Sequence, residues 1–185
     1  MSDARSKWDA RYEDPSYGKG PPSALLAEHR ELFPEGGRAL DIACGAGRNT
    51  VYLAEQGLDV VGLDISAVGL RRTREVAQSK GIEVSVQLWD LERSLLPEGP
   101  FDLVACVHYY QPNLAPAITS ALAPGGLLLV EIHTTSNLQF SPRPPRPYLL
   151  TPNELMTWFP ELQTLSYREH IANEQAVAQL VARKL

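Results

Sequence analysis

An acidic residue, a glycine turn and a second acidic residue follow one another in an order that is typical of a nucleotide pocket. Asp41 lies in a short apolar run, residues 39–43, and the turn Gly45-Ala46-Gly47 comes directly after it. The run is typical of a buried parallel strand, and its small neighbours let the backbone of the turn approach a ligand closely. Asp64 follows Gly47 by 17 positions, close to the roughly 20 at which a doubly wound sheet places a ribose-binding carboxylate.

Alternating strands and helices must hold these residues in place. Apolar residues at helical spacing predict helices over residues 49–56 and 66–80, each ended by a glycine. Apolar runs predict strands over residues 58–63, 82–88 and 101–107. This order predicts an α/β fold: a Rossmann-like doubly wound sheet, mostly parallel, with helices on both faces.

The flanking segments complete the expected domain. Residues 162–170 and 175–182 are predicted to be two strands, so close in sequence that they form an antiparallel C-terminal hairpin. An amphipathic helix is expected over residues 23–33. The proline-rich residues 136–147 predict a stiff surface loop, either a plain connection or a lip on which Arg143 and Arg146 attract an anion.

The residues around the turn distinguish between two kinds of cofactor. A nicotinamide or flavin fingerprint has glycine or alanine where this chain has Thr50. A pyrophosphate would also meet the negative charge of Asp41, whereas a cofactor with a cationic methionine end would be attracted to it. An NAD(P)-dependent oxidoreductase is therefore the less favoured alternative, and the chain contains no Tyr-x-x-x-Lys pair.

The run from Asp41 to Gly47 resembles the first motif of the class I S-adenosylmethionine-dependent methyltransferases, with Ala43 where many members have a glycine. Three more motifs stand in the family's order: Asp64, then Asp90-Leu91, then residues 122–126, which read L-A-P-G-G. The sequence W-D-x-R-Y near the N-terminus, followed by Y-G, resembles the small tellurite-resistance (TehB-like) and thiopurine-type members. The chain is thus identified as a member of this family, with S-adenosyl-L-methionine as its cofactor and S-adenosyl-L-homocysteine as the product.

The resemblance implies a role for each matching residue. Asp41 and the turn would hold the methionine end, Asp64 the ribose hydroxyls and Asp90 the adenine amino group. For Asp90 the alternative is a turn or cap residue. The cofactor-binding residues that the resemblance predicts are Tyr12, Asp41, Ala43, Cys44, Gly45, Gly47, Asn49, Asp64, Ile65, Asp90, Leu91 and Val107.

Residues 1–22 are expected to act as a lid within a single methyltransferase domain, residues 1–185. Trp8 and Tyr12 are four positions apart, so a short helix would bring both rings onto one face. Packing of the two rings onto the domain is the alternative explanation. The resemblance favours the lid, because this segment covers the site in the similar enzymes.

Side chains after two central strands are candidates for handling the methyl acceptor. His108 and Tyr109 follow residues 101–107, and His133 ends the strand that begins after the L-A-P-G-G turn. Ligands of open α/β sheets bind at these carboxyl ends. A hydroxyl acceptor would need one of these groups as a base, although His133 is equally explained as a satisfied strand-end histidine.

The sequence says less about the methyl acceptor than about the cofactor. A ring-rich mouth formed by Tyr12, Tyr17, Tyr109 and Tyr110 suits a small acceptor. The resemblance suggests a thiol or a selenium or tellurium oxyanion. A thiolate, selenite or tellurite is already nucleophilic and needs no strong base. A protein that binds S-adenosylmethionine without transferring its methyl group is the alternative.

Composition limits the remaining functions. The 185 residues carry a formal net charge of −5, which argues against nucleic acid as a partner, and Arg71, Arg72 and Arg74 are expected on a solvated helix face. No apolar run approaches the roughly 18 residues of a membrane span. Cys44 and Cys106 share no metal-ligand spacing, so buried free thiols in a cytoplasmic protein without a metal site are expected. The oligomeric state is left open.

Overall fold

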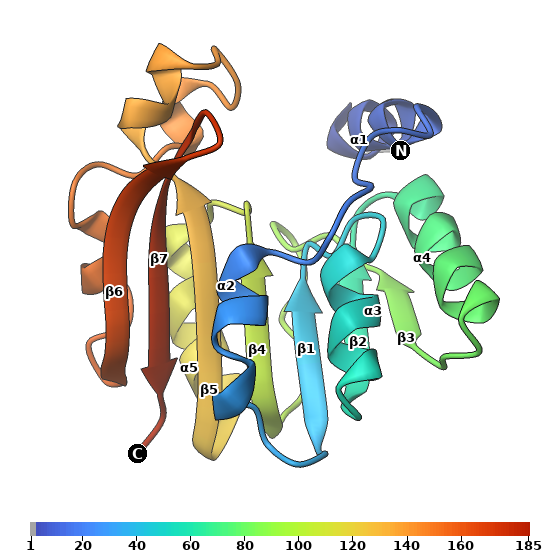
Figure 1. The fold of residues 1–185 in the computed structure, drawn as a ribbon, viewed down its shortest axis with the longest axis horizontal. Coiled ribbons are helices and arrows are strands. Elements are labelled where there is room, and N and C mark those ends of the chain that lie inside the picture. The colour runs from blue at the N-terminus through green and yellow to red at the C-terminus, as the bar shows by residue number, and fades with distance from the viewer. Residues whose placement is uncertain (1–2) are drawn as a thin grey trace.

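The computed structural model describes residues 3–185, which form one seven-stranded sheet in the order β3-β2-β1-β4-β5-β7-β6 (Figure 1). The pairs from β3 to β5 are parallel, and β7 runs antiparallel to both β5 and β6. This confirms the predicted doubly wound sheet with an antiparallel C-terminal hairpin. The strands are β1 (Arg38–Ile42), β2 (Asp59–Asp64), β3 (Ser85–Leu88), β4 (Phe101–Val107), β5 (Leu122–His133), β6 (Gln163–Ala172) and β7 (Gln175–Arg183).

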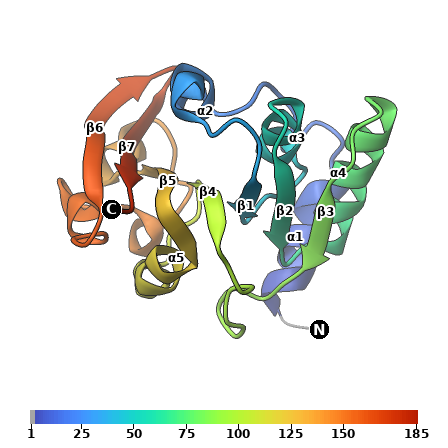
Figure 2. The same cartoon turned by 90° about the horizontal axis from the view of Figure 1, so that it is seen from below.

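Helices cover both faces of the sheet, as predicted. Figure 2 shows α2 and α3 on one face and α5 on the other, and α4 packs beside α3 and β3. The α-helices are α1 (Asp3–Glu13), α2 (Ala24–Glu28), α3 (Arg48–Glu55), α4 (Ala67–Ser79) and α5 (Ala115–Ala121). Short 3₁₀ helices are η1 (Arg30–Leu32), η2 (Pro112–Leu114), η3 (Thr135–Gln139), η4 (Arg146–Tyr148) and η5 (Glu154–Thr157).

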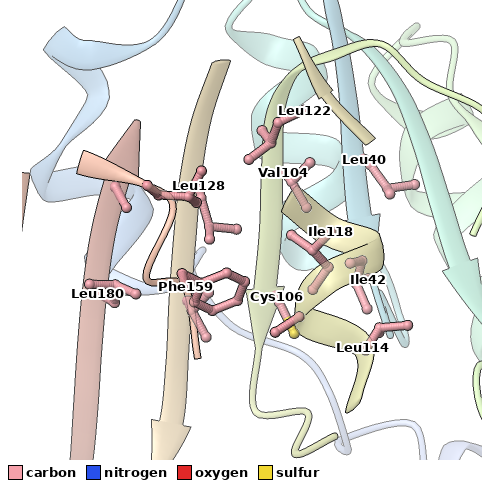
Figure 3. Close-up of a cluster of buried hydrophobic side chains, with 14 of the residues drawn as sticks. Leu40, Ile42, Val104, Cys106, Leu114, Ile118, Leu122, Leu128, Phe159 and Leu180 are labelled. Atoms are coloured by element: carbon pink, nitrogen blue, oxygen red, sulfur yellow. The ribbon is translucent and has the colours of Figure 1, made fainter. Parts of the chain in front are cut away.

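The sheet has a hydrophobic core on each face because its central strands are apolar on both sides. In β1, Leu40 and Ile42 face α5, whereas Ala39 belongs to the cluster under α2 and α3. The first cluster is shown in Figure 3, where Ile118 of α5 lies near Val104 and Ile42, and Phe159 lies between Cys106 and Leu180. Strands buried on both faces are held rigidly, so their carboxyl ends are fixed points for a site.

Local chemistry explains most element boundaries. Ser66 caps α4 as its type suggests, since its hydroxyl accepts a hydrogen bond from Gly69 N at 3.0 Å. The expected helix over residues 23–33 is shorter than predicted: α2 ends at Glu28, and η1 follows. The ring of His29 is 2.9 Å from the Leu25 carbonyl, and Pro34 disfavours helical backbone at the residue before it.

The order of the strands creates a switch point between β1 and β4. From β1 the chain moves outward through β2 to β3, and from β4 it moves the other way to β5. Their connecting helices therefore lie on opposite faces and leave a crevice above the two carboxyl ends, which is where open α/β sheets bind ligands. In Figure 1, α1 lies at this edge of the sheet, above α4.

Candidate functional site

The glycine turn leads from β1 into α3 through left-handed backbone. Ala43, Gly45 and Gly47 have φ angles of 56°, 58° and 81°, a region that residues with a Cβ rarely adopt. At Gly45 there is also no room for a side chain, because a Cβ would lie 2.1 Å from Tyr12 Oη. The turn thus presents bare backbone to the crevice and lets Tyr12 lie directly on it.

Asp41 is buried beneath this turn. Its exposed fraction is 1%, and it accepts a 2.6 Å hydrogen bond from Thr50 Oγ1. Burial raises the pKa of Asp41 to about 7, with the Thr50 bond acting in the opposite direction. Thr50 is the residue that departs from a nicotinamide fingerprint, and its structural role here is to donate this hydrogen bond to Asp41. A buried carboxyl of this kind gains its charge when a cation approaches, which fits the ammonium and sulfonium groups of S-adenosylmethionine.

Asp64, at the end of β2, anchors the turn from its other side. Its two carboxylate oxygens accept hydrogen bonds from Gly45 N at 2.8 Å and Ser66 N at 2.7 Å. Burial raises its pKa, and these backbone bonds oppose that shift. Each oxygen retains a lone pair for a ribose hydroxyl. The sequence did not indicate the bond to Gly45, and the ribose contact stays a prediction.

Asp90 and Leu91, which the resemblance assigns to the adenine, follow β3, and that contact stays a prediction. Asp90 Oδ1 accepts a 3.1 Å bond from Glu92 N, so Asp90 has the turn-capping role that the sequence offered as its alternative. Gln111, which sequence reasoning missed, donates to the Leu91 carbonyl at 3.1 Å and accepts from the Tyr109 hydroxyl. Tyr109 is therefore committed to this end of the site, and burial raises the pKa of its phenol.

The segment before α2 covers the turn. The rings of Trp8 and Tyr12 stack with centroids 6.2 Å apart, as their spacing predicted. Asp9 accepts hydrogen bonds from Ser66 Oγ at 2.7 Å and Val68 N at 3.1 Å, at the N-terminus of α4. Arg72 donates to the backbone carbonyls of Tyr12, Asp14 and Pro15. The expectation that Arg72 belongs to a solvated face was wrong, because its guanidinium holds the covering segment. Residues 1–2 of the expected lid lie outside the described residues.

A polar cluster occupies the other side of the switch point. His108 and His133 stack with ring centroids 4.4 Å apart and an interplanar angle of 6°. His108 Nε2 lies 3.4 Å from Glu131 Oε1. Glu131 is 6% exposed and was not among the predicted site residues. Two of the three candidates for handling the acceptor thus meet, whereas Tyr109 bonds Gln111 beside Leu91.

The remaining predicted residues lie close by, with different partners. Asn49 is buried, and its Oδ1 accepts a 2.9 Å bond from Ser23 N. Ile65 is half-buried beside Asp64, and Val107 is the last residue of β4. Tyr110 was wrongly expected at the mouth: its hydroxyl donates to Glu154 Oε1 at 2.9 Å, and its ring packs edge-on against Trp158.

A cavity of ≈ 350 Å³ opens beside His133, and Arg143 lines it together with Phe140 and Glu174. Of the two arginines that the sequence offered for an anion, only Arg143 is among the lining residues. A larger groove of ≈ 770 Å³ lies along α4 and β3, near Asp59 and Glu83, away from the carboxylates described above.

The two cysteines are buried free thiols, as expected. Burial raises the pKa of Cys106 to about 12. Within residues 3–185, no group of three or more His, Cys, Asp or Glu side chains is placed to hold a metal ion. None of the helices in the same range has the length and apolar character that crossing a bilayer requires.

Comparison with protein families places this site in a known context. A methyltransferase domain model matches residues 39–126, which contain Asp41, the glycine turn and Asp64. An uncharacterized methyltransferase from Synechocystis sp. is 39% identical over 127 residues, covering 64% of this chain and 57% of that protein. The chain thus spans little more than half the length of this curated relative.

Solved structures share the whole fold. TehB from Haemophilus influenzae has a TM-score of 0.75 at 19% identity, covering 96% of this chain and 67% of that one. The magnesium protoporphyrin IX methyltransferase ChlM from Synechocystis, solved with bound S-adenosylhomocysteine, has a TM-score of 0.72 at 18% identity and covers 98% of both chains. At these identities the likeness is one of fold.

Proposed function

We propose that this chain is a class I S-adenosylmethionine-dependent methyltransferase, which transfers a methyl group from S-adenosylmethionine to a small-molecule acceptor. The methyltransferase domain match over residues 39–126 and the shared fold support this proposal. The buried carboxyl of Asp41 beneath a bare glycine turn, at the switch point of the sheet, is the observation that carries this proposal. S-adenosylmethionine supplies an electrophilic methyl group there. The chain's own contribution is to bind the nucleoside and to orient the acceptor in line with it.

The proposed binding mode assigns one task to each end of the crevice. Asp41 balances the positive charge of the methionine end, and Asp64 accepts from the ribose. Asp90 and the backbone of Leu91 contact the adenine, next to the bond between Gln111 and Leu91. The segment ending in Tyr12 closes over the turn, and its bonds to α4 support its role as a lid.

The acceptor is proposed to bind at the carboxyl ends of β4 and β5. Resemblance to the tellurite-resistance group makes a thiol, selenite or tellurite the first acceptors to examine. The cavity beside His133 has room for a molecule of this size. A protein that binds the nucleoside without transferring the methyl group is the alternative, and a transfer assay with methyl-labelled cofactor distinguishes the two.

The test of the cofactor is a calorimetric titration with S-adenosylmethionine, S-adenosylhomocysteine, NAD and NADP. Binding of the two sulfur nucleosides alone is expected. Asp64→Ala should lower their affinity by about tenfold or more, on the scale of a lost hydrogen bond to a charged group.

A matched control is Asp59→Ala, since Asp59 lies at the opposite, amino end of the same strand. That variant should bind the nucleosides as the wild type does. Unchanged affinity in a folded Asp64→Ala protein would contradict the assigned site, and binding of NAD or NADP alone would replace the proposal by the oxidoreductase alternative.

A further inference from the structure

The carboxylate of Glu131 is held by donors on two sides and faces a histidine on a third. Ser23 Oγ donates to Oε1 at 3.2 Å, and the side-chain amide of Gln179 donates to Oε2. His108 Nε2 lies 3.4 Å from Oε1. A buried carboxylate is costly unless it is bonded, and these partners satisfy it while fixing its orientation toward the His108 ring.

The amide of Gln179 is oriented by a further ion pair. Its Oε1 accepts from Arg168 Nε, and Arg168 also pairs with Glu28 at the end of α2. Because the guanidinium can only donate, it fixes the Gln179 carbonyl toward itself and the NH₂ group toward Glu131. The strand register places these side chains next to one another, because Gln179 of β7 pairs with Glu131 of β5 on one side and with Arg168 of β6 on the other.

The backbone of His108 is strained in a way that serves this contact. Its φ is 60°, a left-handed conformation that costs an ordinary residue about 1–2 kcal/mol. Strain of this kind persists where the surrounding structure imposes it, often at functional sites. Here the His108 amide donates to the Glu131 carbonyl at 2.6 Å, and the ring lies between the Glu131 carboxylate and His133. The side chain keeps 28% of its surface exposed at the crevice.

We propose that Glu131 positions His108 as a general base, and that the methyl acceptor therefore carries a proton on the attacking atom, as a hydroxyl or a thiol does. This inference rests on the proposed function and narrows its substrate class: an acceptor already ionised at neutral pH, such as selenite, has no use for the pair. His108 is the catalytic residue, and Glu131 is a positioning residue.

The step balances without a further reactant. His108 Nδ1 takes the proton of the acceptor while the acceptor's electron pair forms the new bond to the methyl carbon. The electron pair of the broken carbon–sulfur bond stays on sulfur. The products are the methylated acceptor, neutral S-adenosylhomocysteine and an imidazolium next to Glu131, whose charge stabilises it.

The groups facing His108 set its resting state. Burial, the neighbouring His133 and the Arg48 guanidinium of α3 lower the pKa of His108, so its ring is neutral at pH 7. The Glu131 carboxylate lies beside Nε2 and favours a proton on that nitrogen. The neutral ring then has its lone pair on Nδ1, as a base requires.

The first test compares acceptors of different acidity. Methyl transfer is measured with a series of substituted phenols, with thiophenol, and with selenite and tellurite, in the wild type and in His108→Asn. Asparagine tolerates left-handed backbone, so the variant should fold. We expect kcat for the least acidic phenols to fall by about 100-fold or more, and the loss to shrink to within about threefold for acceptors that are already ionised. His29→Asn is the control, since His29 bonds only within α2.

A structural role for His108 would lower the transfer to every acceptor equally, and that result would overturn the proposal. So would selenite or tellurite as the only acceptors, with His108→Asn as active as the wild type. Failure of the proposed function has a different signature, because the protein would then bind neither sulfur nucleoside in the titration above.

The second test needs no acceptor. The nitrogen NMR signals of ¹⁵N-histidine-labelled protein, saturated with S-adenosylhomocysteine, report the protonation of each ring, and His108→Asn assigns the signal. We expect a neutral His108 with its proton on Nε2 at pH 7, and a loss of that preference in Glu131→Gln. A proton on Nδ1, or a charged ring at pH 7, would contradict the inference whether or not any of the acceptors is methylated.

Discussion

At the scale of single residues, the site contains strained backbone, buried polar side chains and few charged groups. Ala43 has a φ of 56° in the turn, where the resembled family often has glycine. Asp41 lies beneath that turn with a displaced pKa, and His108 has left-handed backbone at the end of β4. Each of these costs stability in the free protein, and each lies at the crevice. The strained and desolvated groups therefore mark the site.

Ala43→Gly should stabilise the protein. Glycine removes the left-handed strain of about 1–2 kcal/mol and adds about 0.5–1 kcal/mol of backbone entropy to the unfolded chain. A net gain of up to about 1.5 kcal/mol in the free energy of unfolding is expected from denaturant titration. Ala46→Gly is the matched control in the same turn. Ala46 does not have a positive φ, so glycine at this position should lower the free energy of unfolding. Equal changes in the free energy of unfolding in the two variants would show that the backbone of Ala43 is not strained.

The affinity for S-adenosylmethionine should rise between about pH 6 and 8, because the cation favours the charged form of Asp41, whose pKa is about 7. Calorimetry across this range measures the dependence of affinity on pH, which Asp41→Asn should flatten.

The stability of the cofactor-free protein should depend on pH with the opposite sign. An acid whose pKa is raised above 3.8 by folding binds more protons in the native state, so the free energy of unfolding of the cofactor-free protein falls as pH rises from about 4 to 7.

At the scale of elements, the segment containing α1 is joined to α4 by side chains on both sides. Asp9 accepts from the first turn of α4, and Arg72 from the middle of α4 donates back to three carbonyls. Tyr12 lies between them on the glycine turn, with 9% of its surface exposed. The arrangement joins this segment to the helix that follows Asp64, so the proposed closure and the proposed ribose contact would share one element.

Asp9→Ala should make S-adenosylhomocysteine dissociate faster. Two hydrogen bonds to the start of α4 are lost, and about 1–2 kcal/mol corresponds to a rate increase of about fivefold to thirtyfold if closure limits release. Stopped-flow displacement measures the rate. Asp14→Ala is the control, because the Asp14 carboxylate bonds only Ser16. Identical dissociation from the two variants would show that α1 is not a lid.

At the scale of the whole molecule, the residue that follows β7 is bonded to the end of α5 and to the start of β5. Lys184 Nζ donates to the carbonyls of Thr119 and Leu122 at 2.8 and 2.7 Å, at the end of α5. Its backbone pairs with Gly125 and Gly126 in the turn before the apolar part of β5. A cation at a helix C-terminus satisfies carbonyls that have no partner within the helix.

Lys184→Met should lower the free energy of unfolding by about 1.5–3 kcal/mol, the usual range for hydrogen bonds to a charged group. Thermal unfolding monitored by circular dichroism measures it. Lys80→Met is the comparison, since Lys80 forms an exposed pair with Glu55 at 2.7 Å and should contribute less than about 1 kcal/mol. A loss at Lys184 no larger than at Lys80 would refute its capping role.

The sequence by itself determined the architecture and the glycine turn with its two flanking carboxylates. Apolar runs and glycines are local signals, and they predicted β4 over residues 101–107 without error. The acid and the glycine turn were enough to place the crevice, because strand order in a doubly wound sheet puts such turns at one edge. The stacking of Trp8 on Tyr12 also followed from helical spacing alone.

Only the tertiary structure decided which side chains meet at the carboxyl ends of β4 and β5. Glu131 and His108 meet because Val107 of β4 pairs with Glu131 of β5, a register that no local pattern encodes. Gln179 and Arg168 join them through two further strand pairings. Tyr110, by contrast, turns away to Glu154. Contacts between residues far apart in sequence depend on how strands align and helices pack. The period of two in a strand shows which side chains share a face, but it does not name the residue that each one meets on the neighbouring strand.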